Sequence, residues 1–423
     1  MEEEMKRNLA EFLNDSPTSY QAIDNVKEEL LSKGFIELDE ASKYDIEAGK
    51  DYFVTRNESA VIAFSIPKNF EGIRIVASHS DSPYFKIKEN PELKKANSYC
   101  VLNVEKYGGM LQSPWFDRPL SVAGRVFVEE DGKLVSKHID LEKPMCMIPS
   151  LAIHMDREAN NGKAFNPQKD LLPLMGMVSG DETPKLMDQV AAKANIKSED
   201  VLGYDLYVYN NEKAIVWGEN DEFISGPRLD DLQCVYTTLS GFLSAKRSEA
   251  LSLYTVFDNE EVGSSTRQGA ASTFLRDTLK RIYDALGRSF EDYEIDLAKG
   301  FMISADNAHA IHPNNEEKAD PVNRPVIGQG VAMKFAGNQK YCTDGFSAAY
   351  FRQVAKRAGK ELQVFTNRSD VAGGSTLGNL SNNQVALPTV DIGLPQLAMH
   401  SPYETAGVKD GEDLEAIIKV FFN

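Results

Sequence analysis

Apolar residues recur along the chain in two patterns, one of short continuous runs and one of single positions repeated every three or four residues. Residues 60–66 form a short apolar and β-branched run that predicts a buried strand, whereas residues 18–33 repeat apolar side chains every three or four positions, which predicts an amphipathic helix. The same succession resumes near residue 227, where a helix to about Ala245 precedes the apolar strand Leu253–Phe257. This alternation of helices and strands is typical of an α/β fold.

The pattern changes across residues 84–226. Many short β-like runs there are separated by Gly, Pro, Asp and Asn, and only one clear helix, Lys185–Lys193, interrupts them. Because helix–strand alternation precedes and follows this stretch, the pattern indicates a β-rich insertion. We therefore expect a discontinuous first domain of residues 1–85 and 227–423, with residues 86–226 forming the inserted domain.

Length and charge narrow the class of protein. At 423 residues the chain is too long for one ordinary compact core, which favours two domains. Its hydrophobic fraction of 42% and charged fraction of 26% are those of a soluble globular protein. The net charge of -18 argues against nucleic acid or an anionic membrane as a partner, since no cationic excess is available to neutralise phosphates.

The cysteines and the first residues bear on the compartment. The four cysteines are far apart and form no CxxC pair, so they fit neither a zinc finger nor a disulfide framework. The chain starts with Met1 and three glutamates, without a basic region or an apolar run, and no uncharged apolar stretch is long enough to span a bilayer. We therefore expect a cytoplasmic protein without a signal peptide.

An acidic turn follows the strand Leu253–Phe257 and carries Asp258, Glu260 and Glu261. Two adjacent glutamates at the mouth of an apolar strand destabilise the fold unless a partner compensates the charge that leaves water. A divalent metal ion is such a partner, because one glutamate could bind it while its neighbour, which points in another direction, faces the metal's water. The alternative is a solvated acidic turn in an acidic protein.

Four further residues stand in comparable places, and each also has a structural explanation. His79 follows an apolar strand, and Asp81, two residues on, projects to the same side and could orient it. Asp230 opens a helix, where the helix dipole favours an anion. Asp306 and His400 follow apolar runs. Taken singly, such residues are often paired or capping groups with a structural role.

Taken together, these residues predict a metal site. In an open α/β sheet, functional residues gather at the carboxyl ends of the strands, so positions far apart in sequence can converge. Two histidines and three carboxylates suit a pair of divalent ions, zinc first, with Mn2+ or Co2+ able to substitute. Glu260 would then take the proton of a shared water and pass it to the leaving amine. The candidate ligands are His79, Asp230, Glu261, Asp306 and His400.

The chain also resembles a known family, the aspartyl aminopeptidases, over nearly its whole length. Together the shared motifs are highly specific. They are Ser16-Pro17-Thr18, Ser78-His79-Ser80-Asp81, Arg228-Leu229-Asp230-Asp231-Leu232, Asp258-Asn259-Glu260-Glu261-Val262-Gly263-Ser264, Ser304-Ala305-Asp306, His309-Ala310-Ile311-His312-Pro313 and Gln396-Leu397-Ala398-Met399-His400-Ser401.

The resemblance implies a fold, an assembly and a set of ligands. Family members are cytosolic di-zinc peptidases with a three-layer α/β/α metallopeptidase sandwich, interrupted by a β-rich dimerisation domain. They assemble into large tetrahedral shells, dodecamers in the well-described cases. By resemblance, His79, Asp230 and Asp306 hold one zinc ion, whereas Asp230, Glu261 and His400 hold the other.

The resemblance also implies roles for five residues around the metals. Glu260 is then the general base, Asp81 supports the first zinc position, and His154 reaches the active site of a neighbouring subunit. Lys334 and Tyr341 lie beside the substrate, where a lysine would favour an N-terminal Asp or Glu. Without the resemblance, His154 would be interpreted as a core-edge histidine and Lys334 as a snorkelling residue at a strand edge.

We therefore expect a di-zinc aminopeptidase that removes an N-terminal Asp or Glu from peptides with a free N-terminus. Three alternatives stay open. The first is an aminopeptidase of the same family that prefers neutral or basic residues, and the second is a deacylase or carboxypeptidase on the same scaffold. The third is a binding protein without activity. A requirement for a free amine in the substrate separates an aminopeptidase from the second alternative.

Overall fold

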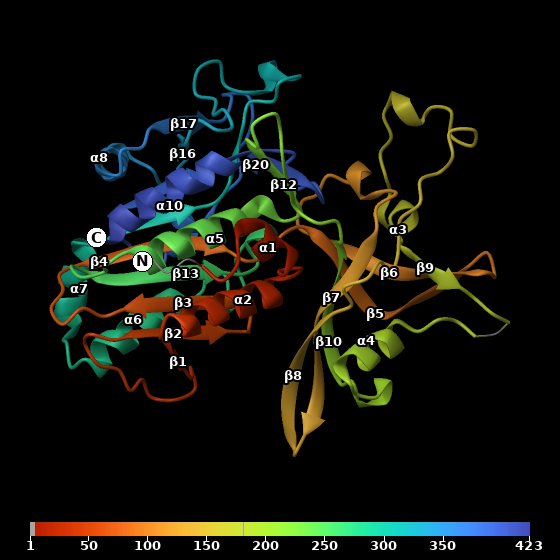
Figure 1. The fold of residues 1–423 in the computed structure, drawn as a ribbon, viewed down its shortest axis with the longest axis horizontal. Coiled ribbons are helices and arrows are strands. Elements are labelled where there is room, and N and C mark those ends of the chain that lie inside the picture. Colours follow the sequence, from red (N-terminus) through yellow and green to blue (C-terminus); the bar gives the residue numbers. More distant parts are fainter. Residues whose placement is uncertain (1–4, 181) are drawn as a thin grey trace.

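The computed structural model describes residues 5–180 and 182–423, whose strands form three sheets (Figure 1). The largest sheet has nine strands, and the four at its centre run parallel to one another. In spatial order its strands are β1 (Ile36–Leu38), β2 (Asp51–Arg56), β3 (Ala60–Ser65), β13 (Leu251–Phe257), β4 (Ile73–His79), β14 (Phe301–Ala305), β18 (Thr389–Gly393), β16 (Val331–Phe335) and β17 (Leu362–Thr366).

Helices cover both faces of the nine-stranded sheet. Side chains alternate along a strand, so Leu253 of β13 packs into one buried cluster and its neighbour Tyr254 packs into the other. The Tyr254 side is covered by α1 (Leu9–Asn14), α2 (Ser19–Ser32), α5 (Leu229–Ser244), α8 (Gly345–Arg357) and α10 (Val408–Phe422). The Leu253 side is covered by α6 (Phe274–Ala285), α7 (Phe290–Ala298) and α9 (Leu377–Ser381). The predicted three-layer α/β/α sandwich is confirmed.

A second, wholly antiparallel sheet of six strands has its own apolar core, against which α4 (Leu186–Ala194) packs. Figure 1 shows it beside the large sheet, with the short α3 (Pro167–Asp170) next to β6. Its spatial order is β8 (Lys133–Asp140), β7 (Leu120–Glu130), β10 (Gly203–Asn210), β5 (Tyr84–Lys95), β6 (Tyr99–Tyr107) and β9 (Leu174–Met177).

A third sheet joins segments that are distant in sequence. Its order is β11 (Ile215–Trp217), β12 (Phe223–Gly226), β20 (Glu404–Gly407), β19 (Pro395–Leu397) and β15 (Ala308–His309). Two of these strands, β11 and β12, precede residue 227 in sequence but connect through β20 to the C-terminal segment. The division of the chain into residues 1–85 with 227–423 and residues 86–226 stays a prediction.

One polar cluster links the two larger sheets. His138 of β8 lies between two carboxylates, with its Nδ1 2.5 Å from Oδ2 of Asp24 in α2 and its Nε2 3.1 Å from Oε2 of Glu58 in the β2–β3 turn. Arg125 of β7 donates to the same Glu58 and to Asp205 of β10. Charged groups that meet at a junction between two cores fix the orientation of one against the other.

Candidate active site

Three neighbouring parallel strands bring candidate residues to one edge of the large sheet. His79 is the last residue of β4 and pairs with Phe257, the last residue of β13. The turn after β13 forms a short 3-10 helix, Glu260–Val262, and Asp306 directly follows β14, which pairs with β4 on its other side. The predicted convergence at the carboxyl ends of the strands is what these pairings produce.

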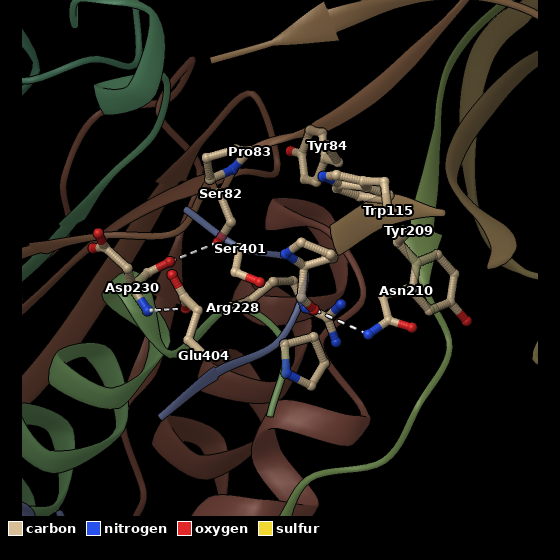
Figure 2. A pocket seen from close by; sticks show the side chains of 12 residues that line it. Ser82, Pro83, Tyr84, Trp115, Tyr209, Asn210, Arg228, Asp230, Ser401 and Glu404 are labelled. Atoms are coloured by element: carbon tan, nitrogen blue, oxygen red, sulfur yellow. Dashed lines mark hydrogen bonds between the residues drawn. The ribbon is translucent and has the colours of Figure 1, made fainter. Parts of the chain in front are cut away.

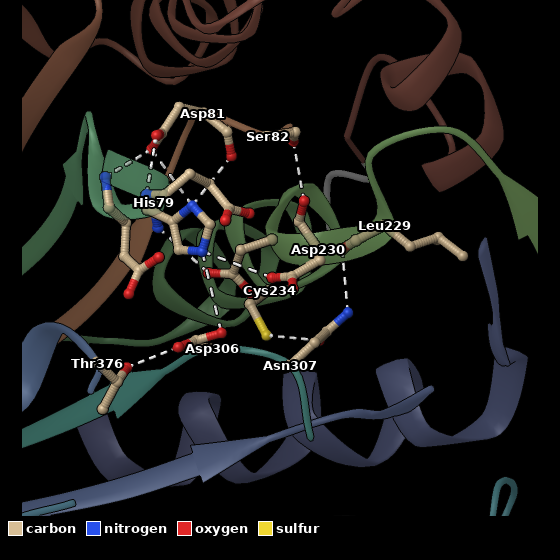
Figure 3. Close-up of polar contacts among 12 residues, drawn as sticks. His79, Asp81, Ser82, Leu229, Asp230, Cys234, Asp306, Asn307 and Thr376 are labelled. Atoms are coloured by element: carbon tan, nitrogen blue, oxygen red, sulfur yellow. Dashed lines mark hydrogen bonds and ion pairs between the residues drawn. The ribbon is translucent and has the colours of Figure 1, made fainter. Parts of the chain in front are cut away.

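The carboxylate of Asp230 lies between two histidines. Its Oδ1 is 3.5 Å from Nε2 of His79, and its Oδ2 is 3.5 Å from Nε2 of His400. Each histidine also faces a second carboxylate. Oδ1 of Asp306 is 3.9 Å from Nε2 of His79, and Oε2 of Glu261 is 3.3 Å from Nε2 of His400. Figure 3 shows the His79 ring facing Asp230 and Asp306. One carboxylate thus serves two groups of ligand atoms.

The spacing and chemistry of these groups fit zinc. Ligands held 2.0–2.3 Å from a tetrahedral zinc are roughly 3.3–3.7 Å apart, the range of the separations around Asp230. Among the described residues, three carboxylate oxygens here are buried without a hydrogen-bond partner, namely Oδ1 of Asp230, Oδ1 of Asp231 and Oε1 of Glu261. Buried, unpaired anionic oxygens are costly, and a divalent cation between them removes that cost. Three groups of donors converge: His79, Asp230, Asp231 and Asp306 form one, His79, Glu260 and Glu261 a second, and Asp230, Glu261 and His400 a third.

The start of α5 is not the regular helical cap that the sequence suggests. Asp230 and Asp231 have non-helical backbone angles inside the span assigned to α5, so neither sits in a regular first turn. Their side chains are instead used by the site: Asp230 faces the histidines, and Oδ2 of Asp231 accepts the backbone N–H of His79 at 3.2 Å. Asp231 therefore orients the end of β4.

Glu260 and Glu261 occupy different environments although they are adjacent. Glu261 faces His400, whereas Glu260 lines a cavity of about 310 Å³ together with Asp230, Asp306 and His400. Burial raises the pKa of Glu260 to about 8; the nearby aspartates add to this shift and His79 opposes it. Glu260 thus lies beside the candidate ligands and opens onto a cavity. A general base that takes a proton from water is expected in such a position.

Asp81 supports the site without facing the cavity. It is fully buried, and its backbone carbonyl oxygen lies 3.0 Å from Nδ1 of His79, with its carboxylate Oδ1 further away at 3.4 Å. The same carboxylate accepts the backbone N–H groups of Glu260 at 3.0 Å and Glu261 at 3.2 Å. Asp81 therefore holds the far side of the His79 ring through its backbone carbonyl and the backbone of both glutamates through its carboxylate. A backbone carbonyl is one of the groups that orient a histidine beside a metal.

Lys334 and Tyr341 line the same cavity. Nζ of Lys334 is buried 3.5 Å from Oδ2 of Asp306 and lies 5.3 Å from the centre of the Tyr341 ring. Asp306 also accepts a hydrogen bond from Thr376 at 2.7 Å. The ammonium group thus already neutralises one candidate ligand, a contact that the sequence did not reveal.

Comparison with known proteins identifies the family. The model of the family described as "Aminopeptidase I zinc metalloprotease (M18)" matches residues 12–422. The chain belongs to this family. It is therefore a zinc metallo-aminopeptidase, which hydrolyses peptide bonds, and the resemblance noted in the sequence is confirmed.

The matches cover nearly all of this chain and most of each similar protein. A probable M18 family aminopeptidase 2 of Clostridium acetobutylicum is 43% identical over 427 residues, which cover 99% of each chain. The solved structure of the Ape4 and Nbr1 complex contains a chain that is 36% identical with a TM-score of 0.94, covering 98% of this chain and 84% of that one. The S. cerevisiae mApe1 dodecamer is 26% identical with a TM-score of 0.85, covering 98% and 95%.

Two buried residues of this M18 aminopeptidase escaped the sequence reasoning. Glu404 accepts the backbone N–H of Asp230 at 3.0 Å, as Figure 2 shows. It also accepts the backbone N–H of His400 at 2.7 Å, so it fixes the backbone of two candidate ligands at once. Its burial raises its pKa to about 8. Thr376 bonds Asp306, as described above. A glutamate four residues after a histidine has no distinguishing sequence signal, and neither has a lone threonine.

His154 lies apart from the candidate ligands. It is exposed in the segment between β8 and α3, which projects from the six-stranded sheet (Figure 1). Within one subunit, the cavity at the strand ends is lined by other residues.

No helix among residues 5–180 and 182–423 is long and apolar enough to cross a membrane.

Proposed function

We propose that this M18 enzyme is a di-zinc aminopeptidase whose two ions share Asp230. The observation that carries the proposal is the placement of the two oxygens of this carboxylate, one facing His79 and the other facing His400 at equal distances of 3.5 Å. Because the two histidines face different oxygens of one carboxylate, that carboxylate is placed to bridge two ions. The first position would be held by His79, Asp230 and Asp306, and the second by Asp230, Glu261 and His400.

The chain's own groups suit peptide hydrolysis at such a site. When bound, paired zinc ions polarise the scissile carbonyl and acidify a water molecule. Glu260, in the cavity wall, accepts the proton of the attacking water and returns it to the leaving amine. Asp81 keeps His79 and the two glutamates in position, and the hydroxyl of Tyr341 is available to the substrate's oxyanion.

The cavity's cation supports a preference for acidic N-terminal residues. The ammonium group of Lys334 is desolvated, and burial works against its charge, yet Asp306 keeps it charged by raising its pKa. A carboxylate side chain of the substrate would meet this positive group, whereas a lysine or arginine side chain would be repelled. We therefore propose Asp and Glu as the residues removed.

Assembly belongs to the same proposal. The dodecamer described for the related mApe1 supports a homo-oligomer here. The six-stranded sheet would be the dimerising part, as the resemblance noted in the sequence implies. His154, exposed on that sheet's projecting segment, would then enter the active site of a neighbouring subunit. The cytoplasmic location expected from the sequence stays a prediction.

The test combines metal analysis with a substrate panel. The purified enzyme should hold two zinc ions per subunit and should cleave Asp and Glu chromogenic substrates faster than Leu or Lys substrates. N-acetylated forms of the same substrates should be inert, because an aminopeptidase needs the free amine. Cleavage of the acetylated forms would favour a deacylase, and one ion per subunit would contradict the shared carboxylate.

Replacing the general base separates chemistry from metal binding. Glu260→Gln should retain two zinc ions and lose about 10²–10⁴-fold in turnover, since only the proton acceptor is removed. Metal content should be measured on the same preparation as turnover. Full turnover in the metal-replete variant would contradict the role assigned to Glu260.

A further inference from the structure

The last residue of β6 and the four that follow it run from the six-stranded sheet to the candidate metal centre. We propose that this segment, Tyr107–Leu111, is a positioning element for the second zinc position, the one assigned to Glu261 and His400. The proposal rests on the function proposed above. It adds to that function a role for residues of the six-stranded sheet within their own subunit.

Tyr107 reaches the site through Asp81. Its hydroxyl donates a hydrogen bond to Oδ2 of Asp81 at 2.7 Å and accepts one from Nδ2 of Asn259, also at 2.7 Å. The same Asp81 holds the backbone N–H groups of Glu260 and Glu261. Burial, with the charge of Asp81, raises the pKa of Tyr107 well above its ordinary value, so the hydroxyl keeps its proton and stays a donor.

Asn259 completes this connection. It has a left-handed backbone conformation with φ of 63°, and it directly precedes the two glutamates. Its Oδ1 accepts hydrogen bonds from Thr266 at 2.7 Å and from Gln268 at 2.8 Å. The glutamate turn is therefore tied on one side to its own loop and on the other to Tyr107, which belongs to the other sheet.

Gly108 brings the backbone of the segment against Glu261. A Cβ atom built at Gly108 would lie 3.1 Å from Cβ of Glu261 and 3.6 Å from its Oε2. Its φ of +76° is also one that residues with a side chain rarely adopt. Glycine is therefore required here for two reasons, and the first of them is contact with a candidate ligand.

The end of the segment holds the other ligand of the same zinc position. The backbone N–H of Leu111 donates to the carbonyl oxygen of His400 at 3.0 Å, and a Cβ at Gly109 would lie 3.9 Å from Nδ1 of that ring. His400 itself has a left-handed φ of 64° and its side chain is one-third exposed. A ligand on such a loop depends on neighbouring backbone for its orientation.

The first experiment titrates Zn2+ into the metal-free full-length enzyme against a competing chelator. Gly108→Ala should displace Glu261 and weaken the second ion roughly 10- to 100-fold while the first binds as in the wild type. The matched control is Gly132→Ala in the β7–β8 turn, where φ is +74° but no atom lies within 4 Å of a new Cβ. It imposes the same backbone penalty without touching the site.

The second variant, Tyr107→Phe, leaves the backbone unstrained and removes only the hydroxyl. It should weaken Zn2+ binding and lower kcat, each roughly 10- to 100-fold, with KM unchanged, because Asp81 and the glutamate turn are affected and the cavity wall is not. Tyr207→Phe is its control: this ring packs 5.8 Å from Tyr107 in the same aromatic cluster, but its hydroxyl is not among the groups that hold Asp81. It should match the wild type.

The outcomes separate the two proposals. If the wild-type enzyme binds one zinc ion, the shared-ion function fails whatever the variants do. If the wild-type enzyme binds two ions and both Tyr107→Phe and Gly108→Ala behave like their controls, the positioning role is overturned while the function stands. A selective loss of the second ion in Gly108→Ala, together with a fall in kcat at constant KM in Tyr107→Phe, supports it.

Discussion

The two larger sheets differ in how they bring residues together. In the nine-stranded sheet, β13, β4 and β14 are parallel, so the residues that follow them meet at one edge although they are far apart in sequence. In the six-stranded sheet every pairing is antiparallel, and successive strand ends fall at opposite edges. The parallel strands bring together His79, Glu261 and Asp306, and Asp230 and His400 join them from α5 and from the loop after β19. The antiparallel sheet supplies a backing that contacts this group.

This difference leads us to expect two kinds of effect, loss of the reacting groups in one sheet and loss of their correct placement in the other. Substitutions at the parallel strand ends should remove metal or the proton acceptor outright. Substitutions in the antiparallel sheet should act through geometry, through the neighbouring subunit or through the junction between the sheets. The predictions below test that separation in order of decreasing effect.

The largest effect is expected at the shared carboxylate. Asp230→Asn should lose both zinc ions and reduce turnover by more than about 100-fold, the upper end for residues that merely support a ligand. Asp231→Asn is the matched control, since its amide oxygen can still accept the backbone N–H of His79. It should keep at least one ion. Equal metal loss in both variants, measured on the purified proteins, would indicate a general acidic cluster.

The antiparallel sheet is expected to act across subunits through His154. Glu260→Gln and His154→Ala subunits should each be inactive alone and should recover activity when mixed under exchange conditions. About one quarter of the sites would then combine an intact Glu260 with an intact His154 from the neighbour, since partners are drawn at random. A fully active isolated monomer, checked by size-exclusion chromatography, would contradict donation between subunits.

A smaller effect is expected at the cavity wall of the parallel sheet. Lys334→Met should reduce the ratio of kcat/KM for Asp over Leu substrates roughly tenfold, about 1.4 kcal/mol, by removing the cation that faces an acidic side chain. Lys356→Met, an exposed position in α8, serves as the control for the loss of one positive charge. An unchanged ratio, or a wild-type preference for Leu or Lys, would refute the specificity proposal and leave the metal mechanism intact.

The smallest effect is expected at the junction between the sheets. Asp24 and Glu58 outweigh burial and raise the pKa of His138 to about 9. A raised folded pKa stabilises the protein fully below about pH 6.5, the ordinary histidine value, and this contribution is lost as pH rises through about 9. The wild type should therefore lose on the order of 2 kcal/mol across that window, after allowance for the half-exposed carboxylates.

His138→Gln isolates this contribution. The variant should be less stable than the wild type at pH 6.5 and nearly equal to it at pH 9.5, in urea unfolding at matched ionic strength. Glu58 does not contribute to the change in stability between pH 6.5 and pH 9.5, because His138 lowers the pKa of Glu58 to about 2. Parallel stability curves for both proteins would show that the junction does not hold a charged histidine.

The sequence predicted that polar residues at the ends of buried strands converge, and their roles as ligands stay a prediction. His79 and Asp306 end apolar runs, and a parallel sheet places such residues together whatever their separation. It predicted local geometry less well. The predicted strand Leu253–Phe257 begins two residues earlier, at Leu251. The non-helical Asp230 also departs from its expected cap, since tertiary contacts outweigh helix propensity there.

The supporting residues could not have been found in this way. Tyr107 lies in the stretch that the sequence marks only as β-rich, and its contact with Asp81 depends on how two sheets pack. Glu404 accepts two backbone N–H groups, and backbone partners leave no trace in a single sequence. Such contacts are set by tertiary structure, so periodicity and spacing carry no information about them.

Glu404 accepts the backbone N–H groups of both Asp230 and His400, and these two bonds have a consequence for the order in which the site forms during folding. Asp230 and Glu404 are 174 residues apart in sequence. Contacts between such distant residues close a long loop, which costs conformational entropy and forms slowly. We therefore expect Asp230 and His400 to reach their final orientation only after the segment that contains Glu404 has packed against the start of α5.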